Sequence, residues 1–68
     1  MDIDKYLSNY SNPKIHPQII RLTNEQKIRI KRFIDEIIEK TGREFEISEL
    51  KILNDRIEIG INYRLSMF

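Results

Sequence analysis

The sequence predicts an α+β protein in which one long amphipathic helix packs on a bulged antiparallel β-hairpin. Apolar residues recur with a helical period within residues 23–42, and they alternate as in a strand through residues 44–65. The dipeptide Asn54-Asp55 divides the alternating segment into two arms. The helix stripe and the apolar hairpin face can bury each other, as layered domains require. A short N-terminal helix and a third short strand are open additions to this fold.

Length and composition bound the protein class. We expect one small domain, residues 1–68, and a complete gene product because the chain starts with Met. No segment approaches the roughly 20 apolar residues of a membrane span, and no N-terminal run resembles a signal peptide. We therefore expect a cytoplasmic location. The chain has no Cys and one His, which excludes disulfides, thiolate metal sites and multi-His metal sites. We expect no metal and no cofactor.

The N-terminal residues 1–16 are predicted to form an arm or a short helix. Asp2 is a candidate N-cap for a helix whose apolar face is Ile3, Tyr6, Leu7 and Tyr10. Pro17 is expected to hold His16 in an extended conformation. The segment Gln18–Leu22 fits a short strand or a turn of helix with Pro17 at its first position, and the sequence leaves both open.

The long helix, residues 23–42, has a start signal and a stop signal. Thr23 and Gln26 fit a capping box, and Gly42 fits the position after the last turn, where a positive φ is needed. Ile28 lies well off the apolar stripe. We expect Phe33, Ile34 and Ile37 to be nearly fully buried against the hairpin. The stripe is Ile30, Phe33, Ile34, Ile37 and Ile38, continued by Thr41, and its expected partners are Ile47, Leu50, Ile59 and Ile61.

The hairpin, residues 44–65, alternates with one fault. A two-residue turn at Asn54-Asp55, with Asn at a positive φ, places Ile52 opposite Ile57. An unbroken register would then turn Ser48 and Glu46 toward the buried face, where unpaired polar groups cost a few kcal/mol.

One extra residue at Ser48-Glu49, opposite Gly60, repairs the pattern. Phe45 and Ile47 then return to the apolar side. The fault therefore predicts a β-bulge that Gly60 accommodates. The corrected register also predicts two pairs of opposite charge on the solvent face: Lys51 with Glu58, and Glu44 with Arg64.

No residue pattern points to catalysis. The chain has no phosphate-binding Gly-rich loop, no nucleophile elbow and no zinc-protease or Ca²⁺-loop motif. We expect the carboxylates Glu44, Glu46, Glu49 and Glu58 to be solvated, and His16 to be a loop histidine. We therefore expect no enzymatic activity.

A basic start to the long helix supports one hypothesis, a nucleic-acid-binding module. The net charge is +1, but residues 1–32 carry +4 and residues 33–68 carry −3. Acidic residues follow on the same helix face, unlike the single-sign stripe of a nucleic-acid binder. The candidate contacts are Arg21, Lys27, Arg29, Lys31 and Arg32.

Surplus apolar residues favour a second hypothesis, a binding protein that acts through protein–protein interaction. Small regulators and inhibitors from mobile elements have this size and composition. A chain this short without a disulfide or metal is marginal alone, so we also expect a homodimer. The candidate interface residues are Ile28, Leu53, Tyr63, Leu65, Met67 and Phe68.

Overall fold

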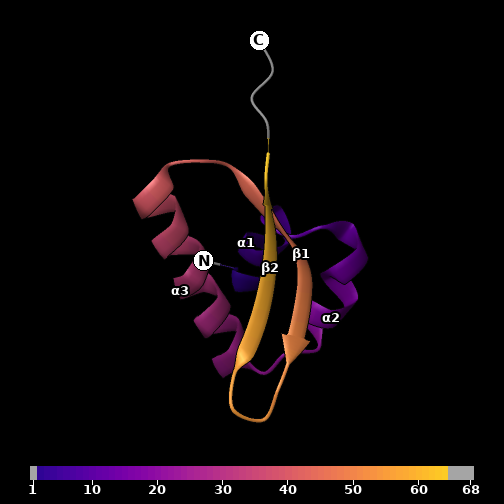
Figure 1. The fold of residues 1–68 in the computed structure, drawn as a ribbon. Coiled ribbons are helices and arrows are strands. Elements are labelled where there is room, and N and C mark those ends of the chain that lie inside the picture. The colour runs from indigo at the N-terminus through magenta and orange to yellow at the C-terminus, as the bar shows by residue number, and fades with distance from the viewer. Residues whose placement is uncertain (1, 65–68) are drawn as a thin grey trace.

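The computed structural model describes residues 2–64 and has the predicted α+β class (Figure 1). A two-stranded antiparallel sheet stands beside helices that come from both the N-terminal and the central parts of the chain. The elements are α1 (Ile3–Asn9), the 3₁₀ helix η1 (Pro13–Ile15), α2 (His16–Ile20), α3 (Asn24–Thr41), β1 (Phe45–Ile52) and β2 (Ile57–Tyr63).

The ends of α1 and α3 are fixed by local side chains, as predicted. The Asp2 carboxylate accepts hydrogen bonds from the first turn of α1. At α3, the Thr23 hydroxyl accepts from the Gln26 N–H at 3.2 Å, and the Thr23 N–H donates to the Gln26 side chain at 2.9 Å. Gly42 ends α3 with φ 62°, a conformation that costs glycine nothing.

The segment that the sequence left open is helical. Pro17 lies in the first turn of α2, where its missing N–H is not needed. The expectation of an extended His16 is wrong, because this residue has helical angles, φ −51° and ψ −45°. The N–H of His16 donates to the Pro13 carbonyl, so η1 runs directly into α2 and sets the conformation.

The hairpin register is confirmed, including the bulge. Ile52 pairs with Ile57 and Phe45 pairs with Tyr63, and the register shifts between Ile47 and Glu49. The turn also lies where predicted, since the Leu53 N–H donates to the Arg56 carbonyl at 2.9 Å. The conformation of the turn differs from the prediction, because Asn54 does not have a positive φ; no described residue other than glycine has one.

Glycine is favoured at position 60 because a side chain there would crowd Glu49, and not because the backbone needs a positive φ. A Cβ added there would lie 3.1 Å from the Cβ of Glu49, and φ of Gly60 is not positive. Lys51 stands opposite Glu58 and Arg64 bonds to the Glu44 backbone, as the predicted register requires, but the printed ion pairs of the described hairpin join other residues. The Arg64 guanidinium lies 3.9 Å from the Glu46 carboxylate, while Glu58 is paired with Arg56 from its own end of the hairpin.

The core lies between β1 and the three helices. Ile34 is fully buried as predicted, but Phe33 and Ile37 are only half-buried, which corrects the prediction. Leu50, Ile59 and Ile61 are also half-buried, and Thr41 is exposed. Part of the α3 stripe faces α1 instead of the hairpin, since α1 is the element that α3 contacts most. The buried apolar residues are Leu7, Ile15, Ile19, Ile30, Ile34, Phe45 and Ile47.

Candidate protein-binding surface

The outer edge of β1 is covered at Ile47 by the N-terminal part of the chain. The Ile47 N–H donates to the Tyr10 carbonyl at 2.7 Å, and the Asn12 N–H donates to the Ile47 carbonyl at 2.9 Å. Ser11 thereby forms a single parallel bridge with Ile47. The Asn12 side chain adds a hydrogen bond to Glu46 at 3.3 Å. These contacts use backbone groups that would otherwise pair with a further strand.

The outer edge of β2 has no such cover. Arg56 and Arg64 bond toward the β1 side, through Leu53 and Glu44 respectively. The extra residue of the bulge lies in β1, so the alternation along β2 is unbroken. The backbone N–H and C=O groups of its even-numbered residues point toward β1, and those of its odd-numbered residues point away from β1. Within residues 2–64 no backbone hydrogen bond reaches these outward groups. We call them the free edge: the backbone N–H and C=O groups of Ile57, Ile59, Ile61 and Tyr63.

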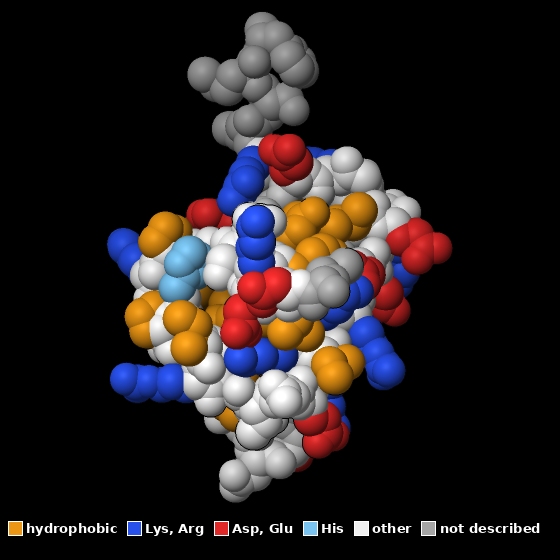
Figure 2. Space-filling view, turned by 180° about the vertical axis from the view of Figure 1, so that it is seen from behind, with side chains coloured by type: hydrophobic (Ala, Val, Ile, Leu, Met, Phe, Trp, Pro, Cys, Tyr) orange, Lys and Arg blue, Asp and Glu red, His pale blue; other side chains and the backbone are white. Residues whose placement is uncertain are grey.

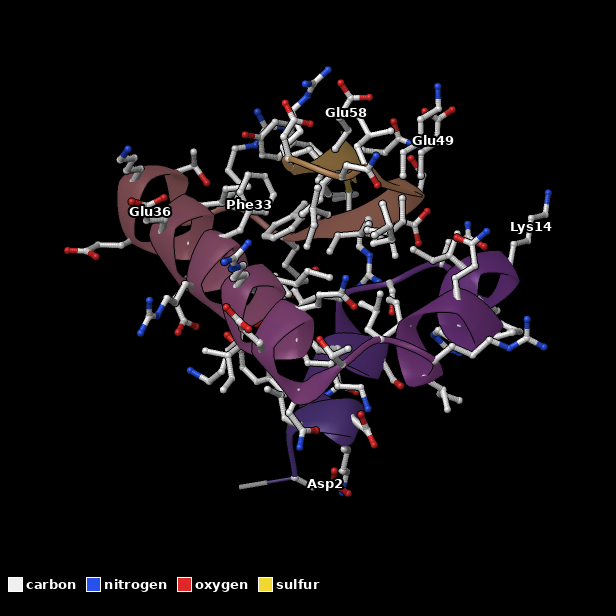
Figure 3. The ribbon with its side chains drawn as sticks, turned by 90° about the horizontal axis from the view of Figure 1, so that it is seen from below. Asp2, Lys14, Phe33, Glu36, Glu49 and Glu58 are labelled. Atoms are coloured by element: carbon white, nitrogen blue, oxygen red, sulfur yellow. The ribbon has the colours of Figure 1, made fainter. Side chains whose placement is uncertain are left out.

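An apolar groove lies along the first part of the free edge. Phe33 of α3 forms one side and Ile57 and Ile59 of β2 form the other. Figure 3 shows Phe33 pointing from α3 toward the hairpin. The groove encloses about 320 Å³ and is bounded at the turn end by charged side chains. We call it the β2–α3 groove: Arg29, Ile30, Phe33, Asp55, Arg56, Ile57 and Ile59.

Three of the predicted interface residues can be placed. Ile28, Leu53 and Tyr63 are 46%, 39% and 40% exposed. Tyr63 ends the free edge, and the Arg43 guanidinium stacks on its ring with 4.4 Å to the ring centroid. Ile28 and Leu53 do not line the β2–α3 groove. Leu65, Met67 and Phe68 lie outside the described residues.

The five basic candidates are not brought together as one free surface. Lys27 is buried at 8% exposure, and its ammonium lies 2.7 Å from the Asp4 carboxylate of α1. Arg29 is paired with Glu25, and Lys31 with Asp35. In the described chain, Arg21 and Arg32 have no ion-pair partner. Figure 2 shows Lys and Arg side chains interspersed with Asp and Glu on the face that it presents.

The buried Lys27 is a residue that the sequence reading placed wrongly on the solvent side. At 100° per residue, Lys27 lies within about 20° of Ile34 around the helix axis, so it belongs to the apolar stripe. Its aliphatic stem can pack in the core while the ammonium reaches Asp4 at the rim. The sequence held a signal for this burial. Lys27 is in line with the apolar stripe of its helix, and Asp4 lies early in the preceding predicted helix.

A polar cluster joins α1 to α3. The Tyr6 hydroxyl donates to the Asp35 carboxylate, which also accepts from Lys31 at 2.7 Å. Burial, and then the Asp35 carboxylate, raise the pKa of Tyr6 from 10.0 to about 12. The Lys31 ammonium and the Tyr6 hydroxyl lower the pKa of Asp35. With the Lys27–Asp4 ion pair, this cluster holds α1 against α3 and gives two of the basic candidates a carboxylate partner.

Across residues 2–64 no cluster of three or more His, Cys, Asp or Glu side chains is arranged to hold a metal ion. No described helix has both the length and the apolar character to cross a bilayer. Comparison with protein-family models, with curated proteins and with solved structures found no match.

Proposed function

We propose that this protein is a small non-enzymatic cytoplasmic protein that acts by binding another protein. The free edge carries this proposal, because proteins usually cover or charge a strand edge to prevent pairing. Residues 10–12 cover the outer edge of β1 at Ile47, whereas no backbone group within residues 2–64 covers the outer edge of β2, which lies beside an apolar groove. Half-exposed apolar side chains next to unpaired backbone groups are what a partner protein can bury.

The test is site-specific photo-crosslinking in the cell that expresses the protein. A photoreactive residue at Tyr63 is expected to give a discrete protein adduct. Lys14 is the matched control, since it is exposed and lies at the rim of the molecule opposite α3 (Figure 3). Equal yields at both positions, or no protein adduct at Tyr63 and none at Arg29 of the groove, would overturn the proposal.

Nucleic-acid binding is the competing hypothesis, and a salt titration separates the two. Binding through five cationic contacts should weaken with a slope of about −4 to −5 in log K against log[salt] for duplex DNA. We expect no binding of this steepness, because Lys27, Arg29 and Lys31 already hold carboxylates. Tight binding with that slope, lost in Arg21→Ala and Arg32→Ala, would favour the nucleic-acid module instead.

A further inference from the structure

The free edge has the residue pattern of a strand that can pair with a copy of itself. In an antiparallel pair of strands, residues that stand opposite each other point to the same face. Two β2 strands joined along the free edge would therefore keep their apolar side chains on one face and their polar side chains on the other. The charged side chains on the polar face are Arg56, Glu58 and Arg64. Their positions distinguish the registers that such a pair could adopt.

The charges favour one symmetric register. When the two-fold axis lies between Ile61 and its copy, Glu58 of each chain stands opposite Arg64 of the other, so opposite charges meet twice. An axis one residue earlier sets Arg56 opposite Arg64, and like charges opposite each other destabilise a strand pair. An axis two residues earlier leaves Glu58 opposite a glycine. An axis still nearer the turn would set β2 against turn residues instead of strand residues.

We propose that the free edge binds a second copy of the chain, with the two β2 strands antiparallel and the two-fold axis at Ile61. This inference rests on the proposed function and names the partner at that site. The outward backbone groups of Ile59, Ile61 and Tyr63 would then all be paired, and the two hairpins would form one continuous sheet. On the apolar face, Ile59 of each chain stands opposite Tyr63 of the other, which is a favourable cross-strand combination.

The apolar side chains along the free edge are those that one chain alone leaves partly open. Ile59 and Ile61 are half-buried, and Tyr63 is 40% exposed. Beside the same residues of a second copy, each would lose further contact with water, and this burial favours association. Across the ladder, Phe45 and Ile47 of β1 are already fully buried. Pairing would thus extend to β2 the burial that β1 has within one chain.

The charged groups that would meet between the two copies are accessible. Glu58 is exposed and points away from the helices (Figure 3). Its partner within the chain is Arg56 at 3.3 Å, and Arg64 lies 3.9 Å from Glu46. Ion pairs at a protein surface contribute little to stability, so exchanging these pairs for pairs between two copies costs little.

The interface is small, so the dimer is expected at high protein concentration. The paired segment runs only from Glu58 to Arg64, whereas a stable interface has about 20–30 residues a side. We therefore expect a dissociation constant on the order of 100 μM or weaker. At micromolar concentration the chain is then a monomer with its free edge open.

The first measurement follows the full chain from micromolar to millimolar concentration. Sedimentation equilibrium should give a mass that rises from that of one chain, 8.3 kDa, toward twice this value. Hydrogen exchange measured by NMR should show protection of the Ile59, Ile61 and Tyr63 amides that increases with concentration. The amides of Gly60 and Asn62 point toward β1 in the single chain and should change little.

Charge reversal tests the register. Glu58→Arg sets arginines opposite each other, and Arg64→Glu sets glutamates opposite each other, so each variant alone should associate about tenfold more weakly than the parent. An equimolar mixture of the two variants restores both pairs of opposite charge, and its association should return to that of the parent. Far-UV circular dichroism checks that each variant folds.

Glu36→Arg and Arg21→Glu are matched controls that change the net charge by the same amounts. Both residues are exposed and lie outside β2. Each control variant alone, and their mixture, should associate as the parent does. The controls separate pairing across the free edge from a general attraction between chains of different net charge.

Three results would overturn the inference. The first is the mass of a single chain at every concentration up to millimolar. The second is a dimer in which the Ile59 and Ile61 amides gain no protection. The third is a mixture of Glu58→Arg and Arg64→Glu that associates no better than either variant alone.

The in-cell crosslink at Tyr63 distinguishes these failures from failure of the proposed function. An adduct to a different protein, beside a single-chain mass at every concentration, would keep the proposed function and overturn the second copy as the occupant. A dimer with the expected protection, but no adduct at Tyr63 or Arg29 in the cell, would overturn the proposed function and leave the pairing in place.

Discussion

The two edges of the hairpin differ in how the chain treats them. On β1, Ile47 exchanges backbone hydrogen bonds with residues 10–12 and its side chain is fully buried. Directly across the ladder, Ile61 of β2 has free outward backbone groups and a half-buried side chain. The same residue type in one cross-strand pair thus has two environments. The fully buried strand side chains therefore belong to β1, whereas the apolar side chains of β2 are only partly buried.

The N-terminal part of the chain creates this asymmetry. α1 is tied to α3 by the Lys27–Asp4 ion pair and by the hydrogen bond from Tyr6 to Asp35. The segment that follows α1 then runs along β1 before η1 and α2 begin. No described segment passes beside β2 in the same way. The edge of β2 is therefore left for something outside residues 2–64 to cover.

The largest expected effect comes from truncating the two members of the Ile47–Ile61 pair. Ile47→Ala should lower the free energy of unfolding by about 2–5 kcal/mol, because it leaves a cavity in the buried core. Ile61→Ala should cost less, about 1–2 kcal/mol, because its side chain is only partly buried. Urea denaturation of both variants measures the difference. Equal losses would mean that the two edges are equally buried.

Gly60→Val is expected to cost about 1 kcal/mol or more, since its Cβ would press on the Cβ of Glu49. The bulge at this site sets which β1 side chains face the core. A double-mutant cycle separates crowding from backbone strain. In a Glu49→Gly background the cost of Gly60→Val should fall clearly. An unchanged cost would locate the requirement for glycine in the backbone itself.

The smallest expected effects are pH-dependent and belong to the covered side. The pKa of Tyr6 is raised in the folded protein, so its contribution is complete below pH 10.0 and is lost as the pH rises toward about 12. The pKa of Asp35 is lowered, so its contribution is present above the ordinary value and is lost as the pH falls through the folded one. Melting temperatures across pH should show a weaker alkaline loss in Tyr6→Phe than in the parent. Identical melting temperatures of the variant and the parent at alkaline pH would show that the Tyr6 hydroxyl does not contribute to the pH dependence of stability.

Local features of the fold could be predicted from the sequence, because each depends on a few neighbouring residues. The capping box at Thr23, the positive φ at Gly42 and the N-cap at Asp2 are local hydrogen-bonding or backbone choices. The bulge at Ser48-Glu49 could be predicted because strand side chains alternate strictly, so one slipped residue shows in the pattern.

Placement in three dimensions could not be predicted in the same way. The helical period does not say which part of a wide stripe faces the sheet and which faces other helices. The burial of Lys27 follows from where α1 packs, and the partial exposure of Phe33 and Ile37 depends equally on tertiary packing. The candidate site was found only in part. Tyr63 was among the apolar residues predicted to lie at an interface, whereas the contribution of Phe33 to the β2–α3 groove needed the tertiary structure.

Native-state amide hydrogen exchange on the free protein, at micromolar concentration, tests the difference between the two edges most directly. We expect fast exchange for the amides of Ile57, Ile59 and Ile61 and slow exchange for those of Glu58, Gly60 and Asn62, because only the even-numbered residues bond to β1. Ile47, on the covered edge, should exchange slowly as well. Slow exchange at Ile57, Ile59 and Ile61 in a protein that sediments as a monomer would contradict the free edge and the binding surface built on it.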